Sequence, residues 1–214
     1  MIETAQDIGF NEIKINDITY NVASEIYLNI IVTDKCNCKC PFCIANIKCN
    51  KLECDFDVYK SKIDFAIKNF NVKDIVFVGG EPTVSPKLFD ILDYLKQYSH
   101  LFNNVILTTN GVLLKNENIM NKILESPVTA INISYHHYDK KINDEIFKND
   151  TLTREEIKDI YKKLILKNIT LRLNNCMFKG NIDSVEEMKK FVNYFKGCVD
   201  IVKFTPILKT EVFD

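Results

Sequence analysis

The sequence predicts an α/β fold built around one parallel sheet, and two observations support this prediction. Short apolar, β-branched runs alternate along the chain with amphipathic segments, which is the pattern of βαβ units. The apolar runs are also nearly continuous, as strands are when helices cover the sheet. Because no long linker or short repeat interrupts the pattern, we expect one main domain.

Hydrophobic periodicity places each element in order. The predicted strands are 27–33, 74–80, 104–111, 129–137, 169–175 and 200–207. The predicted helices are 55–70, 85–98, 117–124, 153–168 and 184–195. We assign 27–214 to the core domain. Residues 1–26 are predicted to be an N-terminal extension with a short strand pair, NEIKIND and ITYNVA.

Local signals support the helix and turn positions. Tyr59, Ile63, Ile67 and Phe70 share one face of the first helix at helical spacing. Ser85 is predicted to cap the second helix, with Pro86 in its first turn, and an Asn-Gly turn ends the strand at 104–111. Capping boxes are predicted to open the last two helices, Thr153 with Glu156 and Ser184 with Glu187.

Composition excludes several classes of function. The chain has 214 residues, 46% hydrophobic and 27% charged, which suits an ordinary globular domain. With 28 basic and 29 acidic residues, the net charge of -1 gives no general attraction to nucleic acid or membranes. The N-terminus lacks a secretory pattern, and no apolar run approaches the ~20 residues of a membrane helix. We therefore expect a cytoplasmic protein with reduced thiols.

Half of the eight cysteines stand in the stretch CNCKCPFC, as Cys36, Cys38, Cys40 and Cys43. A disulfide staple, a zinc site and an iron–sulfur site are all possible uses of such a cluster, and a reducing compartment favours metal. Cys40 and Cys43 with Cys49 and Cys54 would make a four-thiolate zinc cage. The cysteines alone leave the zinc and iron–sulfur interpretations open.

The other unusual residues also follow predicted strands. Parallel α/β folds build their sites at the carboxyl ends of strands, so these residues should meet on one rim. Gly79, Gly80, Glu81 and Pro82 follow the second strand, and the glycines let backbone approach a ligand closely. Taken alone, this stretch is also an ordinary strand-to-helix turn.

The spacing Cys36-x3-Cys40-x2-Cys43, followed one βα unit later by Gly-Gly-Glu-Pro, resembles the signature of the radical S-adenosylmethionine (SAM) superfamily. The resemblance covers about residues 27–206 and implies a partial (βα)6 TIM-like barrel of parallel strands with helices outside. It implies that the three cysteines hold a [4Fe–4S] cluster and leave one iron open for S-adenosyl-L-methionine. Cys38 would then be idle, and Cys49, Cys54, Cys176 and Cys198 would be ordinary thiols.

The resemblance also assigns the cofactor contacts. Phe42 would lie beside the adenine, and the edge of the turn Gly79, Gly80, Glu81 and Pro82 would meet the ammonium group, with Glu81 adding negative charge. Asn110 lies in the turn that ends the strand at 104–111, and Ser134 lies near the end of the strand at 129–137. Each would line the cofactor pocket, or else Asn110 is an ordinary turn residue and Ser134 a small strand residue that packs inward. Asn174 would reach the ribose or the methionine carboxylate of the cofactor, or else form hydrogen bonds with backbone groups at the end of its strand.

Four further residues carry weaker functional hypotheses. Arg172 alternates with leucines, so it points into the barrel as an anion partner or outward as a surface charge. His136, His137 and Tyr138 follow the fourth strand at the expected rim, where substrate contact or proton transfer is one interpretation. Solvated histidines and a packed tyrosine are the structural alternative.

The implied reaction is reductive cleavage of S-adenosylmethionine to a 5′-deoxyadenosyl radical that abstracts hydrogen from an unidentified substrate. The sequence style resembles the branch of molybdenum-cofactor cyclases and peptide maturases, without their additional cysteine-rich segments. Only LKTEVFD follows the last strand, and an open barrel mouth would suit a peptide or protein substrate. A reductant protein such as a flavodoxin or ferredoxin is the expected partner. A glycyl-radical-enzyme activase and a non-catalytic iron–sulfur or zinc module are the alternatives.

Overall fold

The structure is a computed structural model, and it describes residues 10–23, 25–43 and 54–207. Its elements in chain order are β1 (Phe10–Ile15), β2 (Ile18–Ala23), β3 (Ile26–Ile31), α2 (Phe56–Asn69), β4 (Val72–Val78), η1 (Pro82–Val84), α3 (Lys87–Leu95), η2 (Lys96–Leu101), β5 (Asn104–Thr109), η3 (Val112–Lys115), α4 (Glu117–Leu124), β6 (Ala130–Ser134), α5 (Lys140–Phe147), α6 (Arg154–Ile165), β7 (Thr170–Met177), α7 (Val185–Phe195) and β8 (Ile201–Pro206).

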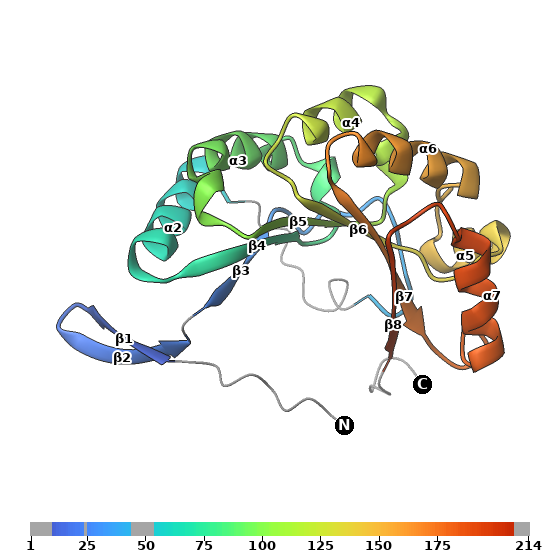
Figure 1. The fold of residues 1–214 in the computed structure, drawn as a ribbon, viewed down its shortest axis with the longest axis horizontal. Helices are drawn as coiled ribbons and strands as arrows, with labels where there is room; N and C mark the ends of the chain where they lie inside the picture. The colour runs from blue at the N-terminus through green and yellow to red at the C-terminus, as the bar shows by residue number, and fades with distance from the viewer. Residues whose placement is uncertain (1–9, 24, 44–53, 208–214) are drawn as a thin grey trace.

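The main sheet confirms the predicted fold class. Its strand order is β3-β4-β5-β6-β7-β8, and every neighbouring pair is parallel. The sheet forms an arch with α2, α3, α4 and α6 along its outer side, which is the form of a partial barrel (Figure 1). The carboxyl ends of all six strands therefore lie on one rim.

The described part of the chain begins with an antiparallel strand pair. β1 and β2 form a separate antiparallel hairpin that pairs with no strand of the main sheet. The hairpin is set apart at one end of the arch (Figure 1).

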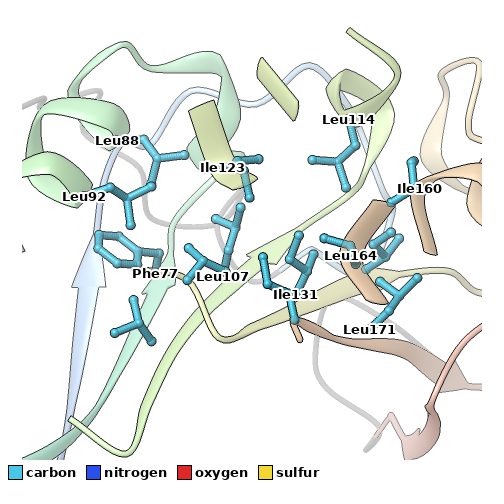
Figure 2. Close-up of a cluster of buried hydrophobic side chains, with 14 of the residues drawn as sticks. Phe77, Leu88, Leu92, Leu107, Leu114, Ile123, Ile131, Ile160, Leu164 and Leu171 are labelled. Carbon is cyan, nitrogen blue, oxygen red and sulfur yellow. The ribbon is translucent and has the colours of Figure 1, made fainter. Parts of the chain in front are cut away.

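The core lies between the sheet and the outer helices. Phe77, Leu107, Ile131 and Leu171, from four adjacent strands, meet apolar side chains of α3, α4 and α6 (Figure 2). These four strand residues are fully buried. Because side chains alternate along a strand, their sequence neighbours point to the inner face of the arch. This alternation determines which residues are available to a site.

Two helix starts differ from the prediction in detail. The Thr153–Glu156 capping box that opens α6 is present in both directions. At α7, the Ser184 hydroxyl accepts from the Glu187 backbone, but the Glu187 carboxylate accepts from Tyr138 and Lys190 instead of completing the box. At α3, the cap position is Pro86, although the Ser85 hydroxyl accepts the Lys87 N–H at 3.3 Å.

The predicted strand 129–137 is too long, and the helix α5 after it was not predicted. β6 ends at Ser134, and the amide oxygen of Asn143 in α5 accepts the backbone N–H groups of both His136 and His137. These bonds draw the chain out of the sheet. Asp139 then caps α5 by accepting the Lys141 N–H at 2.8 Å. The capping aspartate was the available sequence signal for this helix.

Candidate active site

The cysteine loop follows β3 and is held by contacts from distant parts of the chain. The side chain of Asn110 donates to the side-chain oxygen of Asn37 at 2.6 Å. The side chain of Asn149 donates to the Asn37 carbonyl at 2.8 Å, and the Lys39 N–H donates to the Phe147 carbonyl at 2.9 Å. The ends of β5 and α5 therefore fix the loop between its first and third cysteines.

The cysteines of the loop occupy different environments. Cys36 is exposed and Cys40 and Cys43 are half-buried, whereas Cys38 is buried against Val112 and Phe147. A hydrogen bond from the Cys38 thiol is the main cause that lowers the pKa of Cys36 to about 7. Burial raises the pKa of Cys40 to about 12. The inserted Cys38 therefore favours the thiolate form of Cys36.

The Gly-Gly-Glu-Pro turn packs directly on the entry to this loop. The Gly80 N–H donates to the Thr33 carbonyl at 2.7 Å, and the Glu81 N–H donates to the Lys35 carbonyl at 2.8 Å. A Cβ at Gly79 would lie 2.4 Å from the Thr33 oxygen, and a Cβ at Gly80 would lie 2.3 Å from the Lys35 oxygen. Gly79 also has a φ of 142°. The close approach that these glycines permit is thus to the protein's own backbone at 33–35.

Glu81 joins the turn to the end of β5. Its carboxylate accepts from the backbone and hydroxyl of Thr83, the hydroxyl of Thr109 and the backbone N–H of Asn110. Three of these four bonds go to Oε1 and one goes to Oε2. The side chain is 1% exposed, and burial raises its pKa. Glu81 therefore locks two rim loops together, and Oε2 keeps capacity for one further donor.

These loops enclose a cavity of about 350 Å³ on the rim of the barrel, a size within the range of small-molecule sites. It is lined by Cys36, Cys38, Cys40, Phe42, Cys43, Val78, Gly79, Gly80, Glu81, Thr108, Thr109, Asn110, Ser134, His136, Phe147 and Cys176. Of the predicted site residues, Pro82, Asn174, His137 and Tyr138 are not in this lining. The structure thus brings the three signature cysteines, Phe42 and most of the predicted turn residues together.

His136 is the one residue of the His-His-Tyr stretch that lines the cavity. Its ring stacks on Phe147, with centroids 4.8 Å apart and an interplanar angle of 3°, and meets Phe42 edge-on at 5.1 Å. Burial lowers its pKa to about 3, so the ring is neutral near pH 7. Its Nδ1 accepts the Cys176 N–H at 3.2 Å, which leaves the ring proton on Nε2. His136 is therefore a hydrogen-bond donor rather than an acid near neutral pH.

His137 and Tyr138 turn away from the cavity, which does not support the predicted contact with substrate. The Nδ1 of His137 accepts the Asp139 N–H at 2.9 Å, and the Tyr138 hydroxyl donates to Glu187 at 2.8 Å. The physical reason is that the sheet ends at Ser134, so the strand alternation assumed for 129–137 does not extend to these residues.

The three weaker cofactor positions have distinct surroundings. Asn110 is buried, and its side chain bridges Asn37 and the Val112 N–H. Ser134 ends β6 and lines the cavity. Asn174 is the register partner of Ser134 on β7, and its buried side-chain oxygen has no hydrogen-bond partner in the described structure. Of these three, Asn174 has an acceptor left for a ligand.

Cys176 and Phe147 are cavity residues that the sequence analysis missed. Cys176 was taken as an ordinary thiol, but it follows Asn174 by two positions and so shares its face of the strand. Phe147 ends a helix that was not predicted. For Cys176 the available signal was strand alternation from Asn174.

The alternative zinc cage is not assembled from the residues that the structure describes. Cys54 is exposed and lines a separate hollow between β3 and α2, and Cys49 lies outside the described residues. Within the described residues, no three histidine, cysteine or carboxylate side chains already form a metal-binding group.

Helices of the described part of the chain are too short or too polar to cross a membrane.

Comparison with known proteins identifies the family. The model of the radical SAM superfamily matches residues 30–193. The chain belongs to the radical SAM superfamily. It is thus an enzyme of the class that uses a [4Fe–4S] cluster and S-adenosylmethionine.

Relatives of this radical SAM protein include a GTP 3′,8-cyclase of Chlorobaculum tepidum, 27% identical over 72% of the chain and 46% of the relative. An uncharacterised Methanocaldococcus jannaschii protein, MJ0907, is 34% identical over 79% of the chain and 59% of the relative. The chain thus spans less than two thirds of the length of either relative. Both the family and the cyclase relative agree with the predicted branch.

Solved structures confirm the fold. Streptococcus suis SuiB bound to S-adenosylmethionine superimposes with a TM-score of 0.71 and 18% identity, over 89% of this chain and 43% of SuiB. SuiB bound to its precursor peptide SuiA gives a TM-score of 0.67 and 19% identity, over 86% of this chain and 40% of SuiB. At this identity the likeness concerns the radical SAM fold.

The donor set fits the cluster of this family. Three cysteines of one loop line the cavity, and soft thiolates are the ligands that iron–sulfur clusters use. Cys38 is buried against Val112 and Phe147, and its sulfur accepts a hydrogen bond from the side chain of Asn149.

Proposed function

We propose that the chain binds a [4Fe–4S] cluster through Cys36, Cys40 and Cys43 and uses S-adenosylmethionine to abstract hydrogen from a substrate. The observation that supports this proposal is that the cysteine loop, the Gly-Gly-Glu-Pro turn and the end of β5 enclose one cavity. When bound, the cluster and S-adenosylmethionine supply a 5′-deoxyadenosyl radical by reductive cleavage of a carbon–sulfur bond.

The chain's own residues orient the cofactor and exclude water. Phe42 offers an aromatic edge to the adenine, and Ser134 offers a hydroxyl to the ribose. The backbone edge of Gly79 to Pro82 faces the ammonium group, with the charge of Glu81 behind it. The Nε2–H of His136 donates to an acceptor on the cofactor or the substrate. The neighbouring rings of Phe147 and Phe42 keep this region apolar, which protects a radical from side reactions.

The substrate class has two candidates, each with its own support. A peptide is supported by the fold shared with SuiB, which has been solved with its precursor peptide SuiA. A nucleotide is supported by the relatives named GTP 3′,8-cyclase. We place the electron donor in the class of flavodoxins and ferredoxins, and a cytoplasmic location agrees with an oxygen-sensitive cluster.

The test is anaerobic. The protein is reconstituted with iron and sulfide, reduced with dithionite and given S-adenosylmethionine, and 5′-deoxyadenosine is measured by mass spectrometry. Cys40→Ala should abolish the product. Cys54→Ala is the matched control, because this cysteine is exposed and outside the cavity, and it should leave the product unchanged. Equal loss in both variants, or cluster uptake without product, would contradict the proposal.

A further inference from the structure

Cys38 is the cysteine of the loop that the proposed function does not use. The three-cysteine signature has no role for it, yet its side chain is only 5% exposed. Its sulfur accepts a hydrogen bond from the side chain of Asn149 at 3.6 Å, and the side chain packs against Val112 and Phe147. The protein therefore holds this thiol in a defined place, and its remaining contacts indicate which group it can react with.

The remaining contact of Cys38 is with Cys36. The backbone N–H of Cys38 donates to the Cys36 sulfur at 3.3 Å, and the Cys38 thiol donates a second hydrogen bond to the same sulfur. The chain bends at Asn37, between the two cysteines, and the side chain of Asn37 is held by Asn110 at 2.6 Å. A bent chain brings Cα atoms two positions apart closer than the ~7 Å beyond which a disulfide cannot form.

The two thiols differ in their access to solvent. Cys36 is exposed, whereas Cys38 is buried, so an oxidant in solution reaches Cys36 first. An exposed thiol with a second thiol in contact with it is the usual arrangement of redox-sensitive cysteine pairs. Cys40 and Cys43 are half-buried, and the Cys43 N–H donates to the Cys40 carbonyl at 3.2 Å, which places these two in a turn of their own.

We propose that Cys36 and Cys38 form a reversible disulfide when the chain carries no cluster and meets a peroxide. The Cys36 sulfur attacks one oxygen of hydrogen peroxide, the O–O bond breaks, and one water leaves, which gives a sulfenic acid at Cys36. The Cys38 sulfur then attacks the Cys36 sulfur, the S–O bond breaks, and a second water leaves with the Cys38 proton. Two thiols are oxidised by two electrons, and one hydrogen peroxide is reduced to two waters.

This disulfide gives Cys38 a protective role at the proposed cluster site. The role rests on the proposed function, because it requires Cys36 to be a cluster ligand. A sulfenic acid without a second thiol is oxidised further to sulfinic acid, which thiols do not reduce. A disulfide returns to two thiols by exchange, and strain in so short a loop makes its reduction easier. The ligand at Cys36 therefore survives a period without cluster.

The sequence allows a direct test, because trypsin cuts after Lys35 and Lys39 and releases residues 36–39 with only these two cysteines. The reduced, cluster-free full chain is treated with one equivalent of hydrogen peroxide, free thiols are alkylated, and the digest is measured by mass spectrometry. We expect an unalkylated 36–39 peptide that is lighter than its reduced form by two hydrogen atoms, and that dithiothreitol reduces. Cys54→Ala is the matched control and should give the same yield, because Cys54 is exposed and lies outside the loop.

A second experiment measures the protection. The wild-type chain and Cys38→Ser are each treated with the same peroxide dose, reduced with dithiothreitol and reconstituted with iron and sulfide. Their iron content is compared with that of their own untreated samples. The wild-type chain should regain its full iron content. Cys38→Ser should lose at least half of its iron and should carry sulfinic acid at Cys36 in the 36–39 peptide.

Three outcomes would overturn the inference. The 36–39 peptide of the wild-type chain stays reduced or carries sulfinic acid without the disulfide; or Cys36 links instead to Cys40 or Cys43, which joins peptide 36–39 to peptide 40–48; or Cys38→Ser regains its iron as fully as the wild-type chain. If Cys38→Ser does not fold, the peptide map of the wild-type chain still decides. The map is made without cluster or S-adenosylmethionine, so failure of this inference is distinct from failure of the proposed function.

Discussion

Replacement of Gly80 with alanine tests how the Gly-Gly-Glu-Pro turn is joined to the start of the cysteine loop. The new Cβ would lie 2.3 Å from the Lys35 oxygen and 2.6 Å from the Asp34 oxygen. Real contacts of this kind are not shorter than 3.0 Å, so the turn and the loop must separate by at least about 0.7 Å. The backbone bonds of 2.7 Å and 2.8 Å between the two segments then stretch beyond good geometry.

The size of the effect follows from these contacts. Overpacking costs about 1–3 kcal/mol. Each of the two weakened hydrogen bonds adds about 0.5–1.5 kcal/mol. We therefore expect Gly80→Ala to lower the free energy of unfolding by about 2–6 kcal/mol. For a domain of this size the Tm falls by roughly 5–20 °C.

Urea and thermal unfolding of the cofactor-free protein measure this loss, with Gly180→Ala as the matched control. Gly180 has a φ of 79° but no heavy atom within 4 Å of the new Cβ, so it carries backbone strain without a clash. That strain costs about 1–2 kcal/mol. If Gly80→Ala unfolds at the same temperature as Gly180→Ala or above it, the backbone contact between the two loops is not as described.

Four further predictions concern polar side chains of the rim. Glu81→Ala should destabilise the protein by at least about 3 kcal/mol in urea unfolding, because four donors lose their acceptor. Burial raises the pKa of Glu81 above its ordinary 4.5, so the free energy of unfolding should fall as the pH rises from 4.5 through the raised pKa. Glu81→Gln should remove this pH dependence. An unchanged pH dependence in the variant would contradict the assignment to Glu81. Burial lowers the pKa of His136 from 6.5 to about 3, so stability should fall as pH drops below 6.5, by up to about 1.4 kcal/mol per pH unit, and His136→Phe should remove this loss in a pH series of urea unfolding. Tyr138→Phe should leave 5′-deoxyadenosine formation unchanged, because its hydroxyl binds Glu187 outside the cavity; a tenfold loss would restore its predicted functional role.

The sequence by itself determined the strands of the main sheet, most of the helices and the faces that they bury. Strand and helix periodicity placed all six strands of the sheet, because burial on one or both faces imposes a repeat of two or about 3.6 residues. The Thr153–Glu156 box is a local signal, and the structure has it in both directions. The cysteine loop was recognised by its spacing and the Gly-Gly-Glu-Pro turn by its resemblance to a family signature, and both follow strands whose carboxyl ends meet on one rim.

Tertiary structure decided which of these residues face the cavity. Asn149 holds the cysteine loop through a residue 112 positions earlier, and no local pattern encodes such a contact. Tyr138 lies outside the cavity lining, because β6 ends at Ser134 and Asn143 accepts the backbone N–H groups of His136 and His137. Local periodicity fixes the side of an element on which a residue lies. Where an element ends, and which loops meet there, depends on hydrogen bonds between segments far apart in the chain.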